Sequence, residues 1–173
     1  TGYRGVPVYY GDAMKISTTI GFSGDPDRLV KQAQDLEAAG VDLVWGGEIY
    51  GFDLISTLAF LAGQTSRLEL MTGIVPVYSR SPSLIAQTAA TIDALSNGRF
   101  VLGLGTSGPQ VIEGWHGVPF EKPLGRTRDT IAICRSMTPD STRRRTRRRQ
   151  VAGEMCAARA SASLVRALSS CSS

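Results

Sequence analysis

The sequence predicts an α/β fold built on a parallel β-sheet. Short apolar or β-branched segments alternate with amphipathic helical segments from residue 14 to residue 135, in repeats of about 30 residues, the length of a βαβ unit. Parallel neighbours need crossover connections of this kind, and these crossovers are right-handed. With 173 residues, the chain has the size of one domain. Two architectures remain, an open doubly wound sheet and a (β/α)₈ barrel.

The first strand and helix lie between clear boundary residues. Segment 15–22 is rich in β-branched residues and predicts a strand. Asp25 is expected to cap the following helix, which has Pro26 in its first turn and ends at Gly40. Helical spacing predicts that the buried face of this helix consists of Leu29, Ala33, Leu36 and Ala39.

The next two units repeat this plan. Segment 41–45 predicts a second strand, and residues 53–64 predict a second helix. Segment 67–73 predicts the third strand, and the third helix begins near Ser83 after a loop. The inner faces of these helices are expected to carry Ile55, Leu58, Ala59 and Ala62 in the second, and Ile85, Thr88, Ile92 and Leu95 in the third.

The fourth predicted strand, 99–105, runs into a glycine motif. Gly103, Gly105 and Gly108 have the G-x-G-x-x-G spacing of a dinucleotide-binding turn. In that fold the motif follows the first strand, opens directly into a helix and precedes an acidic residue at a strand end. Here it follows the fourth strand, and Pro109 and a predicted loop come before the next helix. The position therefore disfavours a nicotinamide dinucleotide site.

Composition excludes several classes of protein. No segment approaches the roughly 20 apolar residues of a membrane-spanning helix, and residues 1–13 lack the pattern of a signal peptide, so we expect a cytoplasmic protein without a membrane partner. His116 is the single histidine, and the three cysteines lack the spacing of metal ligands. We therefore expect no metal site.

The last part of the chain differs from the rest. Residues 136–173 carry eight arginines against Asp140 and Glu154, a charge of +6, whereas the preceding residues carry −2. This segment has no strand pattern and few large apolar residues, so we expect a disordered basic tail. The abrupt change predicts a shifted reading frame or a false gene end, and residues 1–13 are expected to lie outside the native fold. Nonspecific nucleic-acid binding through the arginine run 143–150 is a disfavoured alternative.

Several segments between Met14 and about Arg135 resemble the luciferase-like oxidoreductases, which use a flavin or the deazaflavin coenzyme F420. The resemblance is carried by "MKISTTIGFSG", "DLVWGGEIYGFD" and "PLGRTRDTIAICR", and most specifically by "SNGRFVLGLGTSGPQVIEGWHG". It implies a partial (β/α)₈ TIM-like barrel in which residues 14–135 form the N-terminal half with about four βα units. A complete barrel has eight units and typically about 250 residues, so we expect a truncated product.

The resemblance also implies catalytic residues at the carboxyl ends of the strands. Glu48, near Tyr50, lies where the family often places an acidic residue or a histidine beside the reactive ring. A carboxyl group there can exchange a proton with substrate if burial raises its pKa, and a solvated glutamate is the alternative. The chain lacks the Asp-His pair of some deazaflavin relatives at this position. His116, beside Trp115, is the second catalytic candidate, and a structural histidine is the alternative. Arg80 is a candidate for contact with the acidic part of the cofactor, and a solvated arginine is the alternative.

Cofactor contacts are implied for two glycine-containing segments. Gly73 and Ile74 correspond to a non-prolyl cis peptide that backs the flavin ring, and an ordinary glycine at a strand end is the alternative. The backbone of the second segment can approach a phosphate or a ring edge without hindrance from side chains. Its candidate residues are Gly105, Thr106, Ser107 and Gly108, and close packing of this loop over the barrel is the alternative.

The function implied by the resemblance is redox chemistry on a small organic substrate. The cofactor is expected to be coenzyme F420, with FMN as the alternative, and the reaction is hydride transfer or monooxygenation. The alternative is that the chain is an inactive fragment of such an enzyme. Half a barrel leaves its first and fourth strands as open edges, which predicts homo-oligomer formation or aggregation through them.

Overall fold

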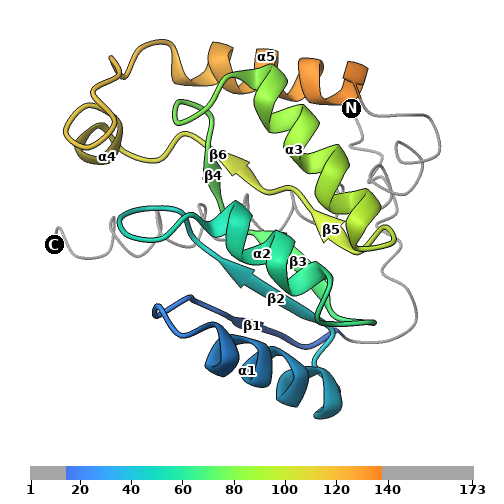
Figure 1. The fold of residues 1–173 in the computed structure, drawn as a ribbon. Coiled ribbons are helices and arrows are strands. Elements are labelled where there is room, and N and C mark those ends of the chain that lie inside the picture. The colour runs from blue at the N-terminus through green and yellow to red at the C-terminus, as the bar shows by residue number, and fades with distance from the viewer. Residues whose placement is uncertain (1–14, 138–173) are drawn as a thin grey trace, which may run out of the picture.

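The computed structural model describes residues 15–137 as alternating strands and helices (Figure 1). The predicted leader 1–13 lies outside the described residues, and so does the predicted tail beyond Met137. Ser136 and Met137 belong to the last helix, so that helix continues past the expected boundary at Arg135.

The strands follow one another across the sheet in the order of the sequence. The main sheet is parallel and has the order β1-β2-β3-β5, and a second sheet pairs β4 with β6. A doubly wound sheet requires a point at which the strand order reverses, and the main sheet has none. The order is that of a segment of a (β/α)₈ barrel. The strands are β1 (Ser17–Thr19), β2 (Leu43–Gly46), β3 (Glu69–Thr72), β4 (Val75–Pro76), β5 (Phe100–Val101) and β6 (Leu104–Gly105).

Side-chain caps start the first three helices, as the sequence predicts for Asp25. Asp25 accepts a hydrogen bond from the Arg28 amide at 3.0 Å, and Asp53 and Ser81 cap the next two helices in the same way. Gly40 follows the end of the first helix with a φ of 86°, a conformation that glycine adopts readily. The helices are α1 (Pro26–Ala38), α2 (Leu54–Ala62), α3 (Pro82–Leu95), α4 (Pro109–Ile112) and α5 (Pro123–Met137).

The largest core cluster contains residues of both the sheet and the helices. Val44, Leu70 and Phe100 are register partners on neighbouring strands and pack in one cluster with Leu58 of α2 and Leu29 of α1. Val44, Leu70 and Leu58 are fully buried. Burial of one such side chain stabilises the fold by about 1.5–3 kcal/mol, so this cluster fixes the register of the strands and hence the positions of the loops that follow them.

The structure corrects four details of the sequence prediction. The predicted strand 99–105 is divided into β5 and β6, which belong to different sheets, and the predicted loop after Gly73 contains β4. The one-turn helix α4 directly follows the glycine motif, where a loop was expected. Two residues expected on inner helix faces are exposed, Ala39 after α1 and Leu95, which is 60% exposed, in α3, because each helix ends there and its end extends beyond the core.

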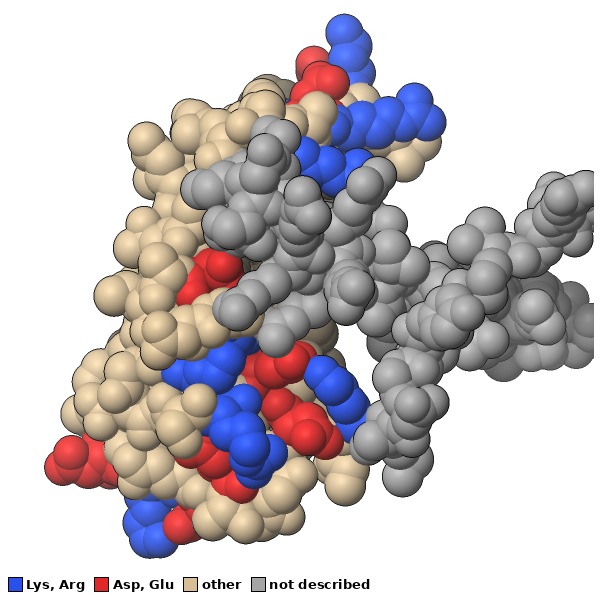
Figure 2. Space-filling model, turned by 90° about the vertical axis from the view of Figure 1, so that its right-hand side faces the viewer, with Lys and Arg blue, Asp and Glu red and all other residues tan. Residues whose placement is uncertain are grey.

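Charged residues are grouped at the amino ends of the strands. Lys15 pairs with Glu69 at 2.9 Å, and Arg67 lies 3.9 Å from Asp42. Figure 2, which views this end, shows basic and acidic side chains side by side. Glu37, near the end of α1, accepts hydrogen bonds from the backbone amides of Ser66, Arg67 and Leu68 at 3.1, 2.5 and 2.7 Å. Glu37 therefore ties α1 to the loop that leads into β3.

Replacing Glu37 by glutamine is expected to destabilise the fold in a pH-dependent way. Burial raises the pKa of Glu37, but hydrogen bonds from Arg67, Leu68 and Ser66 outweigh that effect and lower it. Because the folded-state pKa lies below the ordinary value of 4.5, the stabilisation is present above that value and is lost as the pH falls through the folded-state pKa.

Urea unfolding at a series of pH values measures this effect. At neutral pH, Glu37→Gln should unfold about 1 kcal/mol more easily than the unsubstituted chain, after allowance for solvent screening at this partly exposed site. The difference should shrink in acid. A difference that is independent of pH would contradict this role for Glu37, and the exposed Glu121→Gln serves as the control.

Candidate functional site

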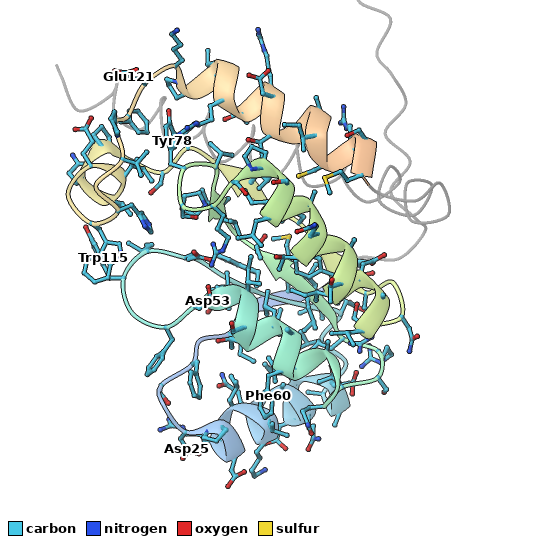
Figure 3. The ribbon with its side chains drawn as sticks, turned by 45° about the horizontal axis from the view of Figure 1, so that its top comes forward. Asp25, Asp53, Phe60, Tyr78, Trp115 and Glu121 are labelled. Carbon is cyan, nitrogen blue, oxygen red and sulfur yellow. The ribbon has the colours of Figure 1, made fainter. Side chains whose placement is uncertain are left out.

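A pocket lies at the carboxyl ends of the strands, the end at which barrel enzymes carry their chemistry. The loop after β2 and helix α4 both lie on this side, at the left of Figure 1. The loop after β2, the loop between β4 and α3 and the segment that follows α4 line a cavity of about 250 Å³. The lining comes from segment 48–53, from Ser79 and Arg80, and from Trp115 and His116. Figure 3 labels Asp53 and Trp115, which belong to two different sides of this lining.

Arg80 joins two carboxylates in this pocket. Its Nη1 donates a hydrogen bond to Glu48 Oε1 at 2.5 Å, and its Nη2 donates to Asp53 Oδ1. The side chains of Arg80 and Glu48 are only 17% and 11% exposed. The sequence predicts a solvated Arg80 or a contact with the cofactor, but the guanidinium is occupied by protein carboxylates at both terminal nitrogens. It therefore acts as a brace that fixes the orientation of Glu48.

Asp53 has two structural roles that combine at this point. As the cap of α2, it accepts a hydrogen bond from the Ser56 amide at 2.6 Å, and it also receives Nη2 of Arg80. Burial raises the pKa of Asp53, but the hydrogen bonds from Ser56 and the charge of Arg80 outweigh that effect and lower it. The ionised carboxylate therefore anchors Arg80 to the start of a helix.

Two buried polar atoms of the pocket lack a hydrogen-bond partner. Within the part of the chain that the structure describes, these atoms are Glu48 Oε2 and His116 Nε2. Buried polar atoms are satisfied in the great majority of cases, so a pair of unsatisfied atoms in one pocket indicates a place for a ligand. Both catalytic candidates from the sequence thus lie in the same pocket, although 68 positions separate Glu48 from His116.

Of the predicted cofactor residues, Ile74 contacts the backbone of Glu48, and Gly73 and Gly105 adjoin Ile74. The peptide bond between Gly73 and Ile74 is cis, as the resemblance implies, and the Ile74 carbonyl accepts a hydrogen bond from the Glu48 amide at 3.2 Å. A Cβ atom at Gly105 would lie 2.4 Å from Ile74 Cδ1, so only glycine leaves Ile74 in its present position. The four residues form one continuous surface at the strand ends.

None of the six predicted cofactor residues lines the pocket, and Thr106, Ser107 and Gly108 of the glycine loop follow β6. Among residues 15–137, the amides of Thr106, Ser107 and Gly108 donate no hydrogen bond. Ser107 has a φ of 57°, and such left-handed residues occur in backbone turns whose amides converge on an anion. Within the described residues, this loop therefore has three backbone amides without an acceptor, and its role in binding a cofactor stays a prediction.

A hydrogen bond and an aromatic contact hold the loop that carries His116. The Tyr78 hydroxyl donates to the Glu121 carbonyl at 2.7 Å, and the Tyr78 ring stacks on Phe120 at 5.2 Å (Figure 3). The Arg126 guanidinium lies 4.5 Å from the centre of the same ring. The buried Tyr78 thus fixes the far end of the segment 113–122.

Sequence reasoning missed the structural brace of the pocket. Asp53 is recognisable only as a helix start, and Arg80 stands 32 positions from Glu48, so no local pattern joins them. The one available signal is that Glu48, Asp53 and Arg80 all follow predicted parallel strands, whose carboxyl ends meet at one edge. Within the described chain, no three His, Cys, Asp or Glu side chains gather as metal ligands, and none of the helices there is long and apolar enough to cross a membrane.

Comparison with known proteins agrees with this architecture. A family model described as luciferase-like monooxygenase matches residues 10–167. A protein of Mycobacterium tuberculosis that is named for coenzyme F420-dependent oxidoreductase activity is 41% identical over 126 residues, which are 72% of this chain and 36% of that protein. The chain spans about a third of the length of the curated relatives that it matches.

Solved structures give the same fold. The coenzyme F420-dependent tetrahydromethanopterin reductase of Methanopyrus kandleri is matched with a TM-score of 0.59 and 24% identity, over 70% of this chain and 38% of that one. The oxygenating constituent of 3,6-diketocamphane monooxygenase from Pseudomonas putida, solved in complex with FMN, is matched with a TM-score of 0.63 and 17% identity, over 72% of this chain and 39% of that one. The fold is a partial TIM-like barrel, and the chain belongs to the luciferase-like monooxygenase family.

Proposed function

We propose that this chain carries the cofactor-binding half of an oxidoreductase that uses coenzyme F420, with FMN as the alternative cofactor. The observation that carries the proposal is the pocket at the carboxyl ends of the strands, where Glu48, Arg80 and His116 meet. The choice of coenzyme F420 is supported by the name of the relative that is 41% identical. The alternative is supported by the FMN complex of a structural neighbour.

The residues at the strand ends fit a flat ring with an anionic tail. Gly105 leaves room in which Ile74 can back a ring, and a Cβ atom at Gly105 would displace Ile74. The unpaired amides of Thr106, Ser107 and Gly108 are donors for a carbonyl or a phosphate. A bound deazaflavin or flavin supplies the acceptance or donation of a hydride, and the protein supplies binding and orientation.

Within this proposal, Glu48 is the residue that exchanges a proton with substrate. Its Oε1 is held by Arg80 at 2.5 Å, which leaves Oε2 free to accept the proton of a bound group. His116 hydrogen-bonds the same molecule through Nε2. Arg80 is a positioning residue, because it acts on substrate only through Glu48. Removal of the Arg80 brace should therefore lower the rate of the proton-transfer step more than it lowers cofactor affinity.

Titration of the full 173-residue chain with each cofactor tests the proposal. The fluorescence of coenzyme F420 should change in a saturable way with a Kd in the micromolar range, and that of FMN should change with a weaker Kd. Gly105→Ala should weaken binding about tenfold, because the new methyl group displaces the flexible end of Ile74. The unfolding midpoint should change little, because the end of the Ile74 side chain can move without displacing the backbone.

Gly63→Ala is the matched control for this titration. A Cβ atom at Gly63, at the end of α2, would lie 3.8 Å from its nearest neighbour, the Phe60 carbonyl oxygen, which is an ordinary contact. Gly63→Ala should bind both cofactors like the unsubstituted chain. Folded protein that binds neither cofactor, or equal affinity for Gly105→Ala and Gly63→Ala, would contradict the proposed site.

A further inference from the structure

The floor of the pocket has an unbalanced charge. Among the described residues that line it, the ionisable groups other than His116 are the carboxylates Glu48 and Asp53 and the guanidinium Arg80. Arg80 has both terminal nitrogens engaged, by Glu48 and by Asp53, and donates a further hydrogen bond to Ser79 Oγ at 3.3 Å. Its single positive charge therefore balances one of the two carboxylates. One negative charge remains without a cation.

The unsatisfied atoms have a definite hydrogen-bonding character. In its ion pair with Arg80, Glu48 is a carboxylate, so Oε2 can only accept a hydrogen bond. His116 Nε2 accepts as well when the neutral ring carries its proton on Nδ1. The carboxylate acceptor Glu48 Oε2 and the excess negative charge, with His116 Nε2 as a second acceptor in the Nδ1–H tautomer, are matched best by a group that has several N–H donors and a positive charge. A carboxylate ligand has neither property.

The rim of the pocket is apolar and exposed. Ile49, Phe52 and Trp115 line it and are 57%, 60% and 59% exposed. Trp115 also packs edge-on against Tyr50, with ring centroids 5.6 Å apart. Exposed apolar side chains grouped at the entrance of a pocket mark a contact surface for a ligand. A cavity of 150 Å³ holds a benzene ring, so about 250 Å³ accommodates a ring with a short substituent.

We propose that this pocket selects a substrate with a primary ammonium group on an apolar, ring-sized body, the ammonium donating to Glu48 Oε2 and His116 Nε2 and the body lying against Trp115 and Phe52. The inference rests on the proposed function and deepens it by naming the class of substrate. Arg80 sets this specificity, because it holds Oε1 of Glu48 and leaves only Oε2 for the ligand.

A matched series of ligands tests the proposal. Benzylamine, benzyl alcohol and benzoate share one ring and differ in the charge of the head group. In calorimetric titrations of the full chain, benzylamine should bind at least tenfold more tightly than benzyl alcohol, and benzoate should bind more weakly than either. Trp45 and Trp115 are the two tryptophans of the chain. The fluorescence change produced by benzylamine should be lost in Trp115→Phe.

Variants of Glu48 and Asp53 test whether these two carboxylates cause the preference for benzylamine. Glu48→Gln removes the excess charge, so benzylamine should lose at least tenfold in affinity while benzyl alcohol changes less than threefold. Asp53→Asn neutralises the second carboxylate, keeps a residue that caps α2 and should lower the preference for benzylamine in the same direction. Glu121→Gln, outside the pocket, is the matched control and should change nothing.

The result that overturns the inference is benzyl alcohol or benzoate binding as tightly as benzylamine. An equal loss in Glu48→Gln and Glu121→Gln also overturns it. Cofactor binding, followed by the fluorescence of the cofactor in the same protein, is a separate measurement. Saturable cofactor binding without any preference for benzylamine rejects the substrate class and leaves the proposed function intact. A preference for benzylamine without cofactor binding rejects the proposed function and supports the ammonium site.

Discussion

Arg99→Ala is expected to lower the free energy of unfolding by about 3 kcal/mol or more, which is a large part of the stability of a domain of this size. Arg99 precedes β5 at the amino end of the sheet and is 9% exposed. Its guanidinium donates to the carbonyls of Ala62, Thr65, Leu68 and Ser96 at 2.7–2.9 Å and to Thr65 Oγ1 at 3.0 Å. Removal of the side chain leaves these acceptors without their donor in a buried place.

Lysine cannot replace Arg99 in this position. Burial lowers the pKa of the Arg99 guanidinium, and the charge of Glu37 partly offsets that effect. An ammonium group has three donors at one point, whereas the guanidinium spreads five donors over a plane. Arg99→Lys should therefore unfold at a urea concentration between those of Arg99→Ala and the unsubstituted chain.

Urea unfolding followed by circular dichroism measures these differences. Arg28→Ala is the matched control, because Arg28 is exposed on α1 and its backbone amide keeps its bond to Asp25 after the substitution. This control should lie within about 0.5 kcal/mol of the unsubstituted chain. An Arg99→Ala variant as stable as Arg28→Ala would show that the loops joined by Arg99 are held by other contacts.

Gly103→Ala is the second substitution with a large expected effect, a loss of about 2–3 kcal/mol. A Cβ atom at Gly103 would lie 1.9 Å from the backbone oxygen of Thr72, which belongs to β3 and cannot move alone. Thr72 Oγ1 accepts a hydrogen bond from the Gly103 amide at 2.8 Å and donates to the Gly103 carbonyl at 2.9 Å. The methyl group would push the backbone between β5 and β6 away from β3, to which Gly103 is joined in both directions.

The same unfolding measurement applies to Gly103→Ala. Gly63→Ala provides the matched comparison, because its Cβ atom meets only an ordinary van der Waals contact. The two variants should differ by about 2 kcal/mol or more. Equal stability of the two variants would contradict the close approach of Gly103 to Thr72.

These two residues illustrate what the sequence could not reveal. The glycine spacing at 103, 105 and 108 fits a phosphate-binding turn, but Gly103 is required by the contact with Thr72 and Gly105 by the contact with Ile74. Arg99 is an ordinary polar residue in the sequence, and most of its acceptors lie at the end of α2 and in the loop that follows, more than 30 positions away. Contacts between residues more than 30 positions apart carry no local periodicity from which they could be predicted.

Local sequence signals predicted helices and strands correctly where a local interaction, such as a helix cap, fixes their position. Asp25, with Pro26 in the first turn, marks the start of α1, and alternating strands and helices predicted the parallel sheet. The barrel order of the strands came from the resemblance, because strand and helix alternation alone fits two architectures. For the candidate site, the resemblance identified Glu48 and His116 as candidates. The contact between Arg80 and Glu48 could be seen only in the folded structure.

The central claim is that the carboxyl ends of the strands form the cofactor site. Amide chemical shifts of the isotope-labelled full chain, recorded as coenzyme F420 is added, test it most directly. We predict progressive shifts for Glu48, Ile74 and the residues from Gly105 to Gly108, and none for Glu37 or Arg67 at the opposite end of the sheet. Shifts centred on Glu37 and Arg67, or no shifts in folded protein, would contradict the account.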